Sequence, residues 1–471
     1  MEIEIPKNFI LGAAASAWQT EGWNGKKDGQ DSFLDCWFKN EYFVWHNGLG
    51  PDIATNFIEK YNEDINLMRE ISLTHYRTSI NWARFFTDYE NFIVDEEYAG
   101  HIDNVIDSLI ESGIAPMLCL EHYEVPEFIL NKYDGWTSRK VVDLYTGYAK
   151  IAFNRYGDRV KYWFTFNEPI VPQTRCYLDA IRYPHEQDTK KWMTWNYHKA
   201  LATAYAVKLF HELGIEGSIG CILNPEMVYP RSSSEADIKA SEIYDLFFNK
   251  VFFDPLILGE YSPKLIELCK KHDIMFEISK EDMDIIKNNT VDFLGINQYY
   301  PKRIKAPRYE WNKNTPFHPE MYYENFDLPG RRMNSSRGWE IYPKIMYDMA
   351  MYIKNNYGNI PWLITENGMG KENEKAYRNK EGVIEDSYRI DFIGSHLFYL
   401  LKAVSEGANC FGYMLWAFTD CVSPMNAFKN RYGLVSIDLE NNLSRSLKMS
   451  AFWYKRIITD RILEIKDSII Y

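Results

Sequence analysis

The stretch "YWFTFNEP", residues 162–169, gives the clearest indication of the fold. Its apolar part is short, rich in aromatic residues and without polar alternation, and it ends at Asn167 and Glu168. Such a run is typical of a strand that is buried on both faces. Seven more runs of this kind occur along the chain: "NFILGAAA" (8–15), "HYRTSINW" (75–82), "APMLCLEHY" (115–123), "GSIGCILNP" (217–225), "VDFLGINQYY" (291–300), "WLITENG" (362–368) and "NCFGYMLWAF" (409–418).

Amphipathic segments separate these runs. In "TNFIEKYNEDINLMREI" (55–71), apolar residues recur every three or four positions, which predicts a helix. The other segments expected to be helical are 101–113, 138–156, 192–213, 235–250, 341–356 and 385–406. Strands that alternate with helices predict a parallel sheet, and eight such units favour a closed (β/α)8 TIM barrel. We therefore predict an α/β fold in which residues 1–471 form a single domain.

The remaining length fits long loops at the C-terminal face of the strands, notably residues 301–338. An open, doubly wound sheet is the alternative architecture. It is less favoured because no glycine-rich phosphate turn of the GxGxxG kind follows any of the runs.

Composition narrows the possible partners. The net charge of -13 argues against nonspecific binding to nucleic acid or to an anionic membrane. No stretch approaches 18 uninterrupted apolar residues, and the N-terminus lacks the basic start of a secretory signal. The seven cysteines are scattered and form no CxxC, which predicts reduced thiols and a cytoplasmic location.

Two glutamates close buried runs and are candidate catalytic groups. Glu168 ends the fourth run and Glu366 ends the seventh. A carboxylate in such a place is costly to desolvate unless it has a task. In a (β/α)8 barrel both would face the mouth at the C-terminal ends of the strands. One could then protonate a glycosidic oxygen while the other attacks the anomeric carbon. The alternative is that both are structural and paired with nearby arginines.

Polar and aromatic residues at the other strand ends would surround this pair. They are Gln19, Arg77, His122, Asn297, Tyr299 and Trp416. Amide, imidazole and indole groups are suited to sugar hydroxyls and to the apolar face of a sugar ring. His122 taken alone is more often a core histidine.

Several of these segments resemble the motifs of glycoside hydrolase family 1, the β-glucosidase family. "TFNEP" (165–169) and "ITENG" (364–368) are similar to its acid/base and nucleophile signatures. Further similar segments follow in the family's order: "FILGAAASAWQTEG" (9–22), "YRTSINWAR" (76–84), "HYEVP" (122–126), "DFLGINQYY" (292–300) and "GWEIYP" (338–343). The resemblance implies a (β/α)8 barrel and retaining hydrolysis of small β-glycosides without metal or cofactor.

The resemblance also implies roles for the two glutamates. Glu168 would be the general acid/base and Glu366 the nucleophile, with their carboxyl groups about 5–5.5 Å apart. Glu168 must then be protonated near neutral pH, and a negative charge on Glu366 favours that state. Arg77, Asn297 and Tyr299 would support the nucleophile.

Sugar-binding roles follow from the same resemblance. Asn167 would bond the 2-hydroxyl, and Gln19 and His122 would bond the 3- and 4-hydroxyls. Trp416 would form the apolar floor, and Trp339 would flank the leaving group.

The segment "SPMNAFKNRYG" (423–433) departs from the neutral-sugar pattern. Where ordinary β-glucosidases have a Glu-Trp pair, this chain has Ser423 and Pro424. The family's 6-phospho-β-glycosidases hold the phosphate with a serine, a lysine further on and a tyrosine two residues after that lysine. Ser423 and Tyr432 resemble that pattern, but the lysine position is Asn430. Either Lys429, one place earlier, reaches the pocket, or Asn430 donates instead.

These features predict a 6-phospho-β-glucosidase that acts through a covalent glycosyl-enzyme intermediate. Its substrates would be cellobiose 6-phosphate or aryl β-glucoside 6-phosphates. The alternatives are a β-glucosidase or β-galactosidase for unphosphorylated sugars, and a 6-phospho-β-galactosidase, which Pro424 disfavours because those enzymes tend to have tryptophan there. A catalytically inactive sugar-binding member is disfavoured because both glutamates are present. A homo-oligomer remains open.

Overall fold

The computed structural model describes residues 2–312 and 314–465, and its centre is a closed barrel of parallel strands. The barrel strands are β2 (Ile10–Ala14), β3 (His75–Ser79), β6 (Ala115–Glu121), β7 (Tyr162–Asn167), β8 (Ser218–Leu223), β10 (Phe293–Asn297), β15 (Trp362–Asn367) and β16 (Cys410–Trp416). They follow one another in chain order, and β16 pairs in parallel with β2 to close the ring. Each predicted run contains one of these strands, so the predicted barrel is confirmed.

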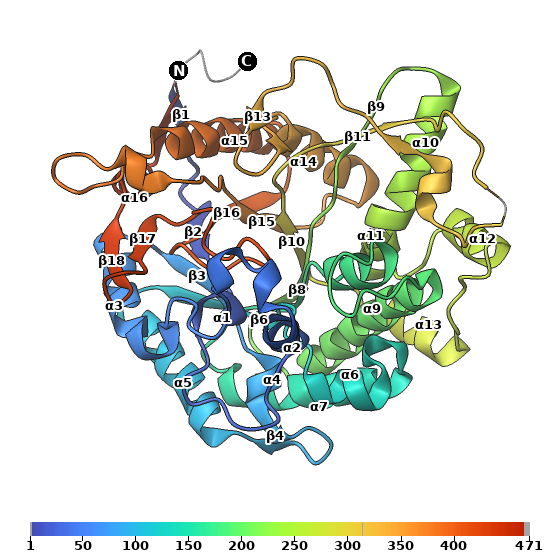
Figure 1. Cartoon of the computed structure of the whole chain (residues 1–471), viewed down its shortest axis with the longest axis horizontal. Helices are drawn as coiled ribbons and strands as arrows, with labels where there is room; N and C mark the ends of the chain where they lie inside the picture. The colour runs from blue at the N-terminus through green and yellow to red at the C-terminus, as the bar shows by residue number, and fades with distance from the viewer. Residues whose placement is uncertain (1, 313, 466–471) are drawn as a thin grey trace.

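Helices cover the outside of the barrel (Figure 1). Those that cover it after successive strands include α3 (Phe57–Glu70), α5 (Glu96–Glu111), α7 (Arg139–Tyr156), α9 (Thr189–Glu212), α10 (Glu235–Asp245), α14 (Ile345–Asn356), α15 (Ser387–Ser405) and α16 (Met449–Asp460). Helix α5 begins earlier than predicted because Asp95 caps it. The Asp95 carboxylate accepts the backbone N–H of Glu97 at 3.2 Å and of Tyr98 at 3.4 Å.

The barrel interior is filled with side chains. This inner layer contains Ala14, Met117, Cys119, Phe164, Ile222, Phe293, Leu363 and Met414. A second and larger apolar cluster lies between the strands and the helices. Because both faces of each strand are buried, the strands are continuous apolar runs in the sequence.

The long segment 301–338 carries small sheets of its own. Strand β11 (Lys302–Lys305) pairs in parallel with β9 (Val228–Pro230), and β13 (Met333–Asn334) forms a short hairpin with β14 (Trp339–Glu340). The prediction of a long loop here is correct in place, but the segment contains more secondary structure than expected. The hairpin turn lies beside the mouth of the barrel, because Arg337 in the turn and Trp339 directly after it line the cleft described below.

The two ends of the described chain lie side by side (Figure 1). Strand β1 (Glu2–Glu4) pairs with β19 (Ile462–Glu464) in an antiparallel ladder. All seven cysteines are buried and unpaired, as expected for reduced thiols. None of the helices described has both the length and the apolar character needed to cross a membrane.

Candidate active site

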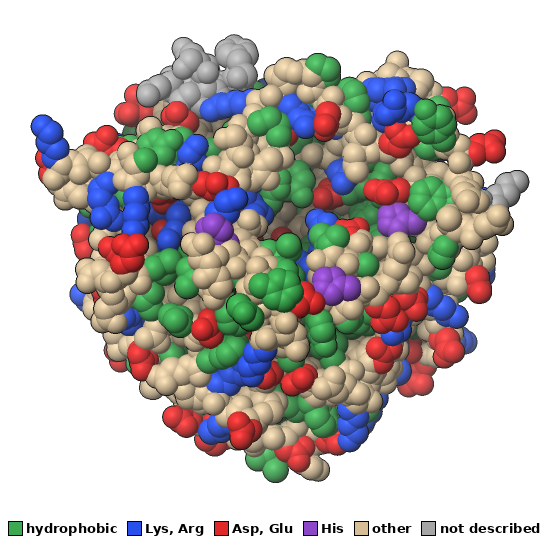
Figure 2. Space-filling model, in the orientation of Figure 1, with side chains coloured by type: hydrophobic (Ala, Val, Ile, Leu, Met, Phe, Trp, Pro, Cys, Tyr) green, Lys and Arg blue, Asp and Glu red, His purple; other side chains and the backbone are tan. Residues whose placement is uncertain are grey.

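A cavity of about 490 Å³ opens at the C-terminal ends of the barrel strands, and Figure 2 shows this face hollowed near its centre. We call it the cleft. Its lining includes the predicted residues Gln19, His122, Asn167, Glu168, Asn297, Tyr299, Trp339, Glu366, Trp416, Ser423 and Tyr432. With Asn224, which follows β8, residues from seven barrel strands and their loops meet at one site, as strand-end placement predicts.

Glu366 lies at the end of β15 with its side chain almost fully buried. Arg77 Nη1 is 2.7 Å from Glu366 Oε1, and the Tyr299 hydroxyl donates to Oε2 at 2.8 Å. Burial raises the pKa of Glu366 to about 7; the positive charge of Arg77 opposes this rise, and the negative charge of Glu168 adds to it. This carboxylate is therefore oriented by two donors and titrates near neutral pH.

Glu168 follows β7 and adopts a left-handed backbone conformation, with φ of 44°. That conformation is costly for a residue other than glycine and is kept only where the surroundings impose it. Here the backbone N–H of Glu168 donates to the carbonyl of Ile222 on β8 at 2.8 Å. Asn297 donates to Oε1 at 2.9 Å, and the Tyr123 hydroxyl donates to Oε2. Sequence reasoning missed Tyr123, although it follows His122 directly.

Arg77 is buried beneath the cleft and connects the polar side chains that surround the glutamates. Its Nη2 donates to Asn167 Oδ1 at 2.5 Å and lies 3.2 Å from His122 Nδ1. Asn297 also donates to Asn167 Oδ1, at 3.1 Å. Burial, aided by the charge of Arg77, holds the pKa of His122 well below its usual range. His122 is therefore a neutral imidazole in a hydrogen-bonded network.

Aromatic rings and an amide complete the walls of the cleft. The rings of His122 and Trp416 stack with their centroids 6.0 Å apart, and Trp339 lies 5.4 Å from Tyr299. Gln19 donates to the carbonyl of Val422 at 2.5 Å, so it connects the end of β2 to the loop after β16. The cleft thus combines flat apolar faces with convergent polar groups.

Lys429 does not reach the cleft, which corrects the prediction that it is a pocket residue. Its Nζ lies 3.2 Å from Glu372 Oε1, and it lines a separate cavity on the other side of the loop. The reason is a contact with a distant segment. Arg431 pairs with Lys371 in an antiparallel bridge, which brings Lys429 beside Glu372. Tyr432 faces the cleft, whereas residues 429 and 431 face away from it. Asn430 is buried but does not line the cleft.

Three arginines in the cleft lining were missed by sequence reasoning: Arg175, Arg182 and Arg337. Arg175 forms an ion pair with Asp179 at 2.5 Å. The guanidinium of Arg337 lies 4.3 Å from the ring centre of Trp339. Arg337 directly precedes the "GWE" segment, and this neighbouring motif is the one sequence feature that indicates a place near the cleft.

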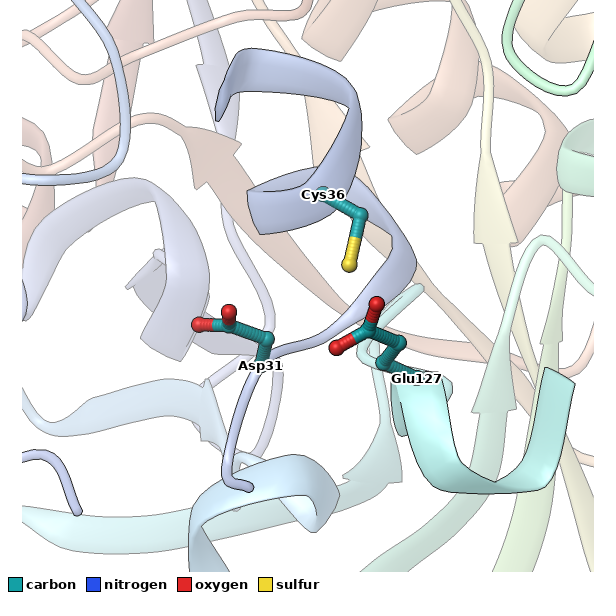
Figure 3. A group of neighbouring side chains, drawn as sticks. All are labelled: Asp31, Cys36 and Glu127. Atoms are coloured by element: carbon teal, nitrogen blue, oxygen red, sulfur yellow. The ribbon is translucent and has the colours of Figure 1, made fainter. Parts of the chain in front are cut away.

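One group of side chains outside the cleft has atoms close enough to hold a cation: Asp31, Cys36 and Glu127 (Figure 3). Asp31 is already paired with Lys26 at 2.6 Å and with Lys39. Burial and nearby carboxylates raise the pKa of the Cys36 thiol far above its usual range. The contacts are those of a neutralised surface cluster, and we assign it no metal.

An eight-stranded α/β barrel with two glutamates at one cleft is the arrangement expected of a glycoside hydrolase. The sequence matches the model of glycosyl hydrolase family 1 over residues 1–462, and the chain belongs to that family. It is 43% identical to 6-phospho-beta-glucosidase GmuD of Bacillus subtilis, covering 97% of this chain and 98% of that protein. It is 31% identical to beta-glucosidase A of Acetivibrio thermocellus, covering 97% and 98%.

The fold is similar to that of solved family members. The family 1 b-glucosidase from Thermotoga maritima superposes with a TM-score of 0.87 at 27% identity, covering 98% of this chain and 99% of that structure. The protein is therefore a family 1 glycosyl hydrolase with the barrel of that family.

Proposed function

We propose that this protein is a 6-phospho-β-glucosidase that hydrolyses phosphorylated β-glucosides with retention of configuration. One observation carries the proposal: Ser423 and Tyr432 of the loop after β16 both line the cleft, and residues 421–432 contain no carboxylate. Two hydroxyl donors without a negative charge suit a phosphate oxygen. The relative at 43% identity, which is named as a 6-phospho-β-glucosidase, supports the same substrate class.

In the proposed reaction, Glu366 attacks the anomeric carbon and Glu168 gives its proton to the leaving oxygen. A covalent glycosyl ester on Glu366 and a free alcohol result. Glu168 then takes a proton from a water molecule whose oxygen attacks the anomeric carbon, and the ester bond to Glu366 breaks. The sugar phosphate is released, Glu366 is again a carboxylate and Glu168 again holds a proton. Arg77 is an ion-pair partner of Glu366 and stabilises its negative charge, which suits Glu366 to the role of nucleophile.

The proposed sugar contacts follow the cleft walls. Asn167 bonds the 2-hydroxyl beside the nucleophile, and Gln19 and His122 bond the 3- and 4-hydroxyls. Trp416 supports the sugar face and Trp339 flanks the leaving group. Asn167 is oriented by Arg77 and Asn297, so its contact is pre-organised for the transition state.

The test compares Ser423→Glu with Ser423→Ala on nitrophenyl β-glucoside 6-phosphate and on nitrophenyl β-glucoside. Two like charges about 4 Å apart repel by about 4 kcal/mol near a protein surface. Ser423→Glu should therefore lower kcat/KM for the phosphorylated substrate by more than about tenfold. Ser423→Ala should lower the same kcat/KM by a smaller factor. If Ser423→Glu leaves the phosphorylated substrate unaffected and improves the neutral one, the protein is a neutral β-glucosidase.

Two further predictions accompany this function. Phosphorylated glycosides arise where a sugar-uptake system phosphorylates them, so the predicted location is the cytoplasm. A homo-oligomer also remains a prediction. Fractionation of the native host and sedimentation of the purified chain would check the two separately.

A further inference from the structure

A phosphorylated substrate brings up to two negative charges into a protein whose net charge is already -13. The lysine expected in the 423–433 loop is not available, because Lys429 points away and is paired with Glu372. The proposed phosphate site therefore needs a positive charge from another part of the fold.

Arg337 lies in the turn between β13 and β14, and this turn is fixed in place. The Asn334 side chain donates to the carbonyl of Gly370 at 3.0 Å and accepts the backbone N–H of Ser336 at 3.1 Å. The Ser336 hydroxyl accepts the N–H of Glu372 at 3.2 Å. The turn is thus tied to the loop that follows the nucleophile strand β15.

The same loop packs against the tyrosine of the proposed phosphate site. A Cβ on Gly370 would lie 2.5 Å from the ring of Tyr432, so the two residues are in close contact. Burial raises the pKa of Tyr432 to about 12, while the positive charge and hydrogen-bonding contact of Arg337 oppose the rise. Arg337 and Tyr432 line the same cleft, and the turn that carries Arg337 is tied to the loop that packs against Tyr432.

The Arg337 guanidinium is not used by any acidic side chain. Across residues 2–312 and 314–465, no carboxylate forms an ion pair with it, and its Nε is buried without a hydrogen-bond partner. Its plane is supported by the Trp339 ring at 4.3 Å. A guanidinium in a cleft lining that packs against a tryptophan ring and has no carboxylate partner is suited to binding an anion.

The other two arginines of the cleft are less suited to this role. Arg175 is already paired with Asp179 at 2.5 Å. Arg182 is buried near Tyr123 and Glu168, whose negative charges would raise its pKa. It therefore lies near the proposed acid/base residue and not beside Tyr432. Arg337 is thus the cleft cation placed with Tyr432.

We propose that Arg337 is the cation that binds the 6-phosphate, in place of a lysine from the 423–433 loop. This inference rests on the proposed function. The guanidinium presents two N–H donors in a planar fork that matches two phosphate oxygens, and it stays charged at every relevant pH. Ser423 and Tyr432, which line the same cleft, would supply hydroxyl donors.

The experiment measures kcat/KM for nitrophenyl β-glucoside 6-phosphate and nitrophenyl β-glucoside with wild type, Arg337→Met, Arg337→Lys and Lys429→Met. The readout is the ratio of the two values, which a general loss of folded protein does not change. Charge-assisted hydrogen bonds are worth about 1.5–3 kcal/mol, so Arg337→Met should lower the ratio by roughly 10–100-fold. Arg337→Lys should lose less, and Lys429→Met should keep the wild-type ratio. If Arg337→Met is unstable, Arg337→Gln replaces it.

Two results would count against the assignment, and they differ from failure of the function itself. A wild type that prefers the phosphorylated substrate, with Arg337→Met unchanged and Lys429→Met impaired, overturns the role of Arg337 alone. A wild type that prefers the neutral substrate overturns the proposed function. Inhibition by glucose 6-phosphate gives a second measure: its inhibition constant should rise in Arg337→Met by the same factor as the ratio falls.

Discussion

Glu366 is held between two opposing influences. Burial favours its neutral form, while Arg77 at 2.7 Å and the Tyr299 hydroxyl at 2.8 Å favour the carboxylate. The balance gives a pKa of about 7, well above the ordinary value for glutamate. A nucleophile of this kind is about half ionised at pH 7 and loses its charge in mild acid.

The first prediction concerns the acid side of the pH profile. Glu366 must be ionised to attack, so kcat/KM should fall as pH drops below about 7. The Tyr299 hydrogen bond lowers this pKa, so Tyr299→Phe should move the acid limb to higher pH and reduce the maximum rate. Steady-state kinetics from pH 4 to pH 9 would measure both.

A surface tyrosine provides the control for that experiment. The Tyr347 hydroxyl donates to Glu406 at 2.5 Å, far from the catalytic pair in the fold. Tyr347→Phe should leave the profile unchanged. An acid limb that stays in place in Tyr299→Phe, or moves to lower pH, would contradict the role given to Tyr299.

The second prediction concerns Glu168 as the proton donor. Removing a general acid typically costs about 10²–10⁴-fold for a leaving group that needs a proton. Glu168→Gln should therefore show a loss of that size on cellobiose 6-phosphate. Formation of the glycosyl-enzyme from dinitrophenyl β-glucoside 6-phosphate should be nearly normal, because dinitrophenolate leaves without protonation. Equal losses in the burst phase for both substrates would contradict the assignment.

At the scale of elements, the strand ends were predictable and the loop was not. Buried strands are continuous apolar runs, so the positions of Glu168 and Glu366 follow from where those runs stop. The 423–433 loop has no such pattern. Lys429 is paired with Glu372, and Arg431 forms a bridge with Lys371, so the position of this loop depends on contacts between distant segments. Spacing in sequence alone could not provide it.

The third prediction tests the close contact between the C-terminal ends of β15 and β16. A Cβ on Gly368 would lie 1.8 Å from the carbonyl oxygen of Trp416, and backbone cannot move aside cheaply. Gly368→Ala should lower the free energy of unfolding by about 1–3 kcal/mol. It should also reduce kcat/KM, because Trp416 and Glu366 both line the cleft. Urea unfolding and steady-state kinetics would measure the two effects.

Gly100 supplies the matched control. It lies within α5, and a Cβ there meets no other heavy atom within 4 Å. Gly100→Ala should stabilise the protein by roughly 0.5–1 kcal/mol, since alanine loses less backbone entropy in a helix. Stability of Gly368→Ala equal to that of the wild type would contradict the close contact.

At the scale of the whole molecule, the barrel itself was predictable because parallel strands covered by helices leave a strong sequence pattern. The two glutamates and the polar and aromatic residues around them were predictable because the barrel brings the C-terminal ends of its strands together. Tyr123 was not identified although it ends a predicted run, because its role depends on its contact with Glu168. Arg337 was not identified because it lies in a turn without a sequence pattern. Arg337 is positioned by the contact between Asn334 and Gly370, which only the folded chain shows.

The net charge of the molecule bears on whether it can bind a phosphorylated substrate. A chain with a net charge of -13 repels a phosphorylated sugar at long range, so binding must come from local groups. Ser423, Tyr432 and Arg337 are the local groups that we propose.

The most direct test of this account is the ratio of kcat/KM for nitrophenyl β-glucoside 6-phosphate to that for nitrophenyl β-glucoside with the wild-type protein. We predict a ratio far above one, because the neutral compound leaves the proposed phosphate site empty. A ratio below one would contradict the assignment of a phosphorylated substrate.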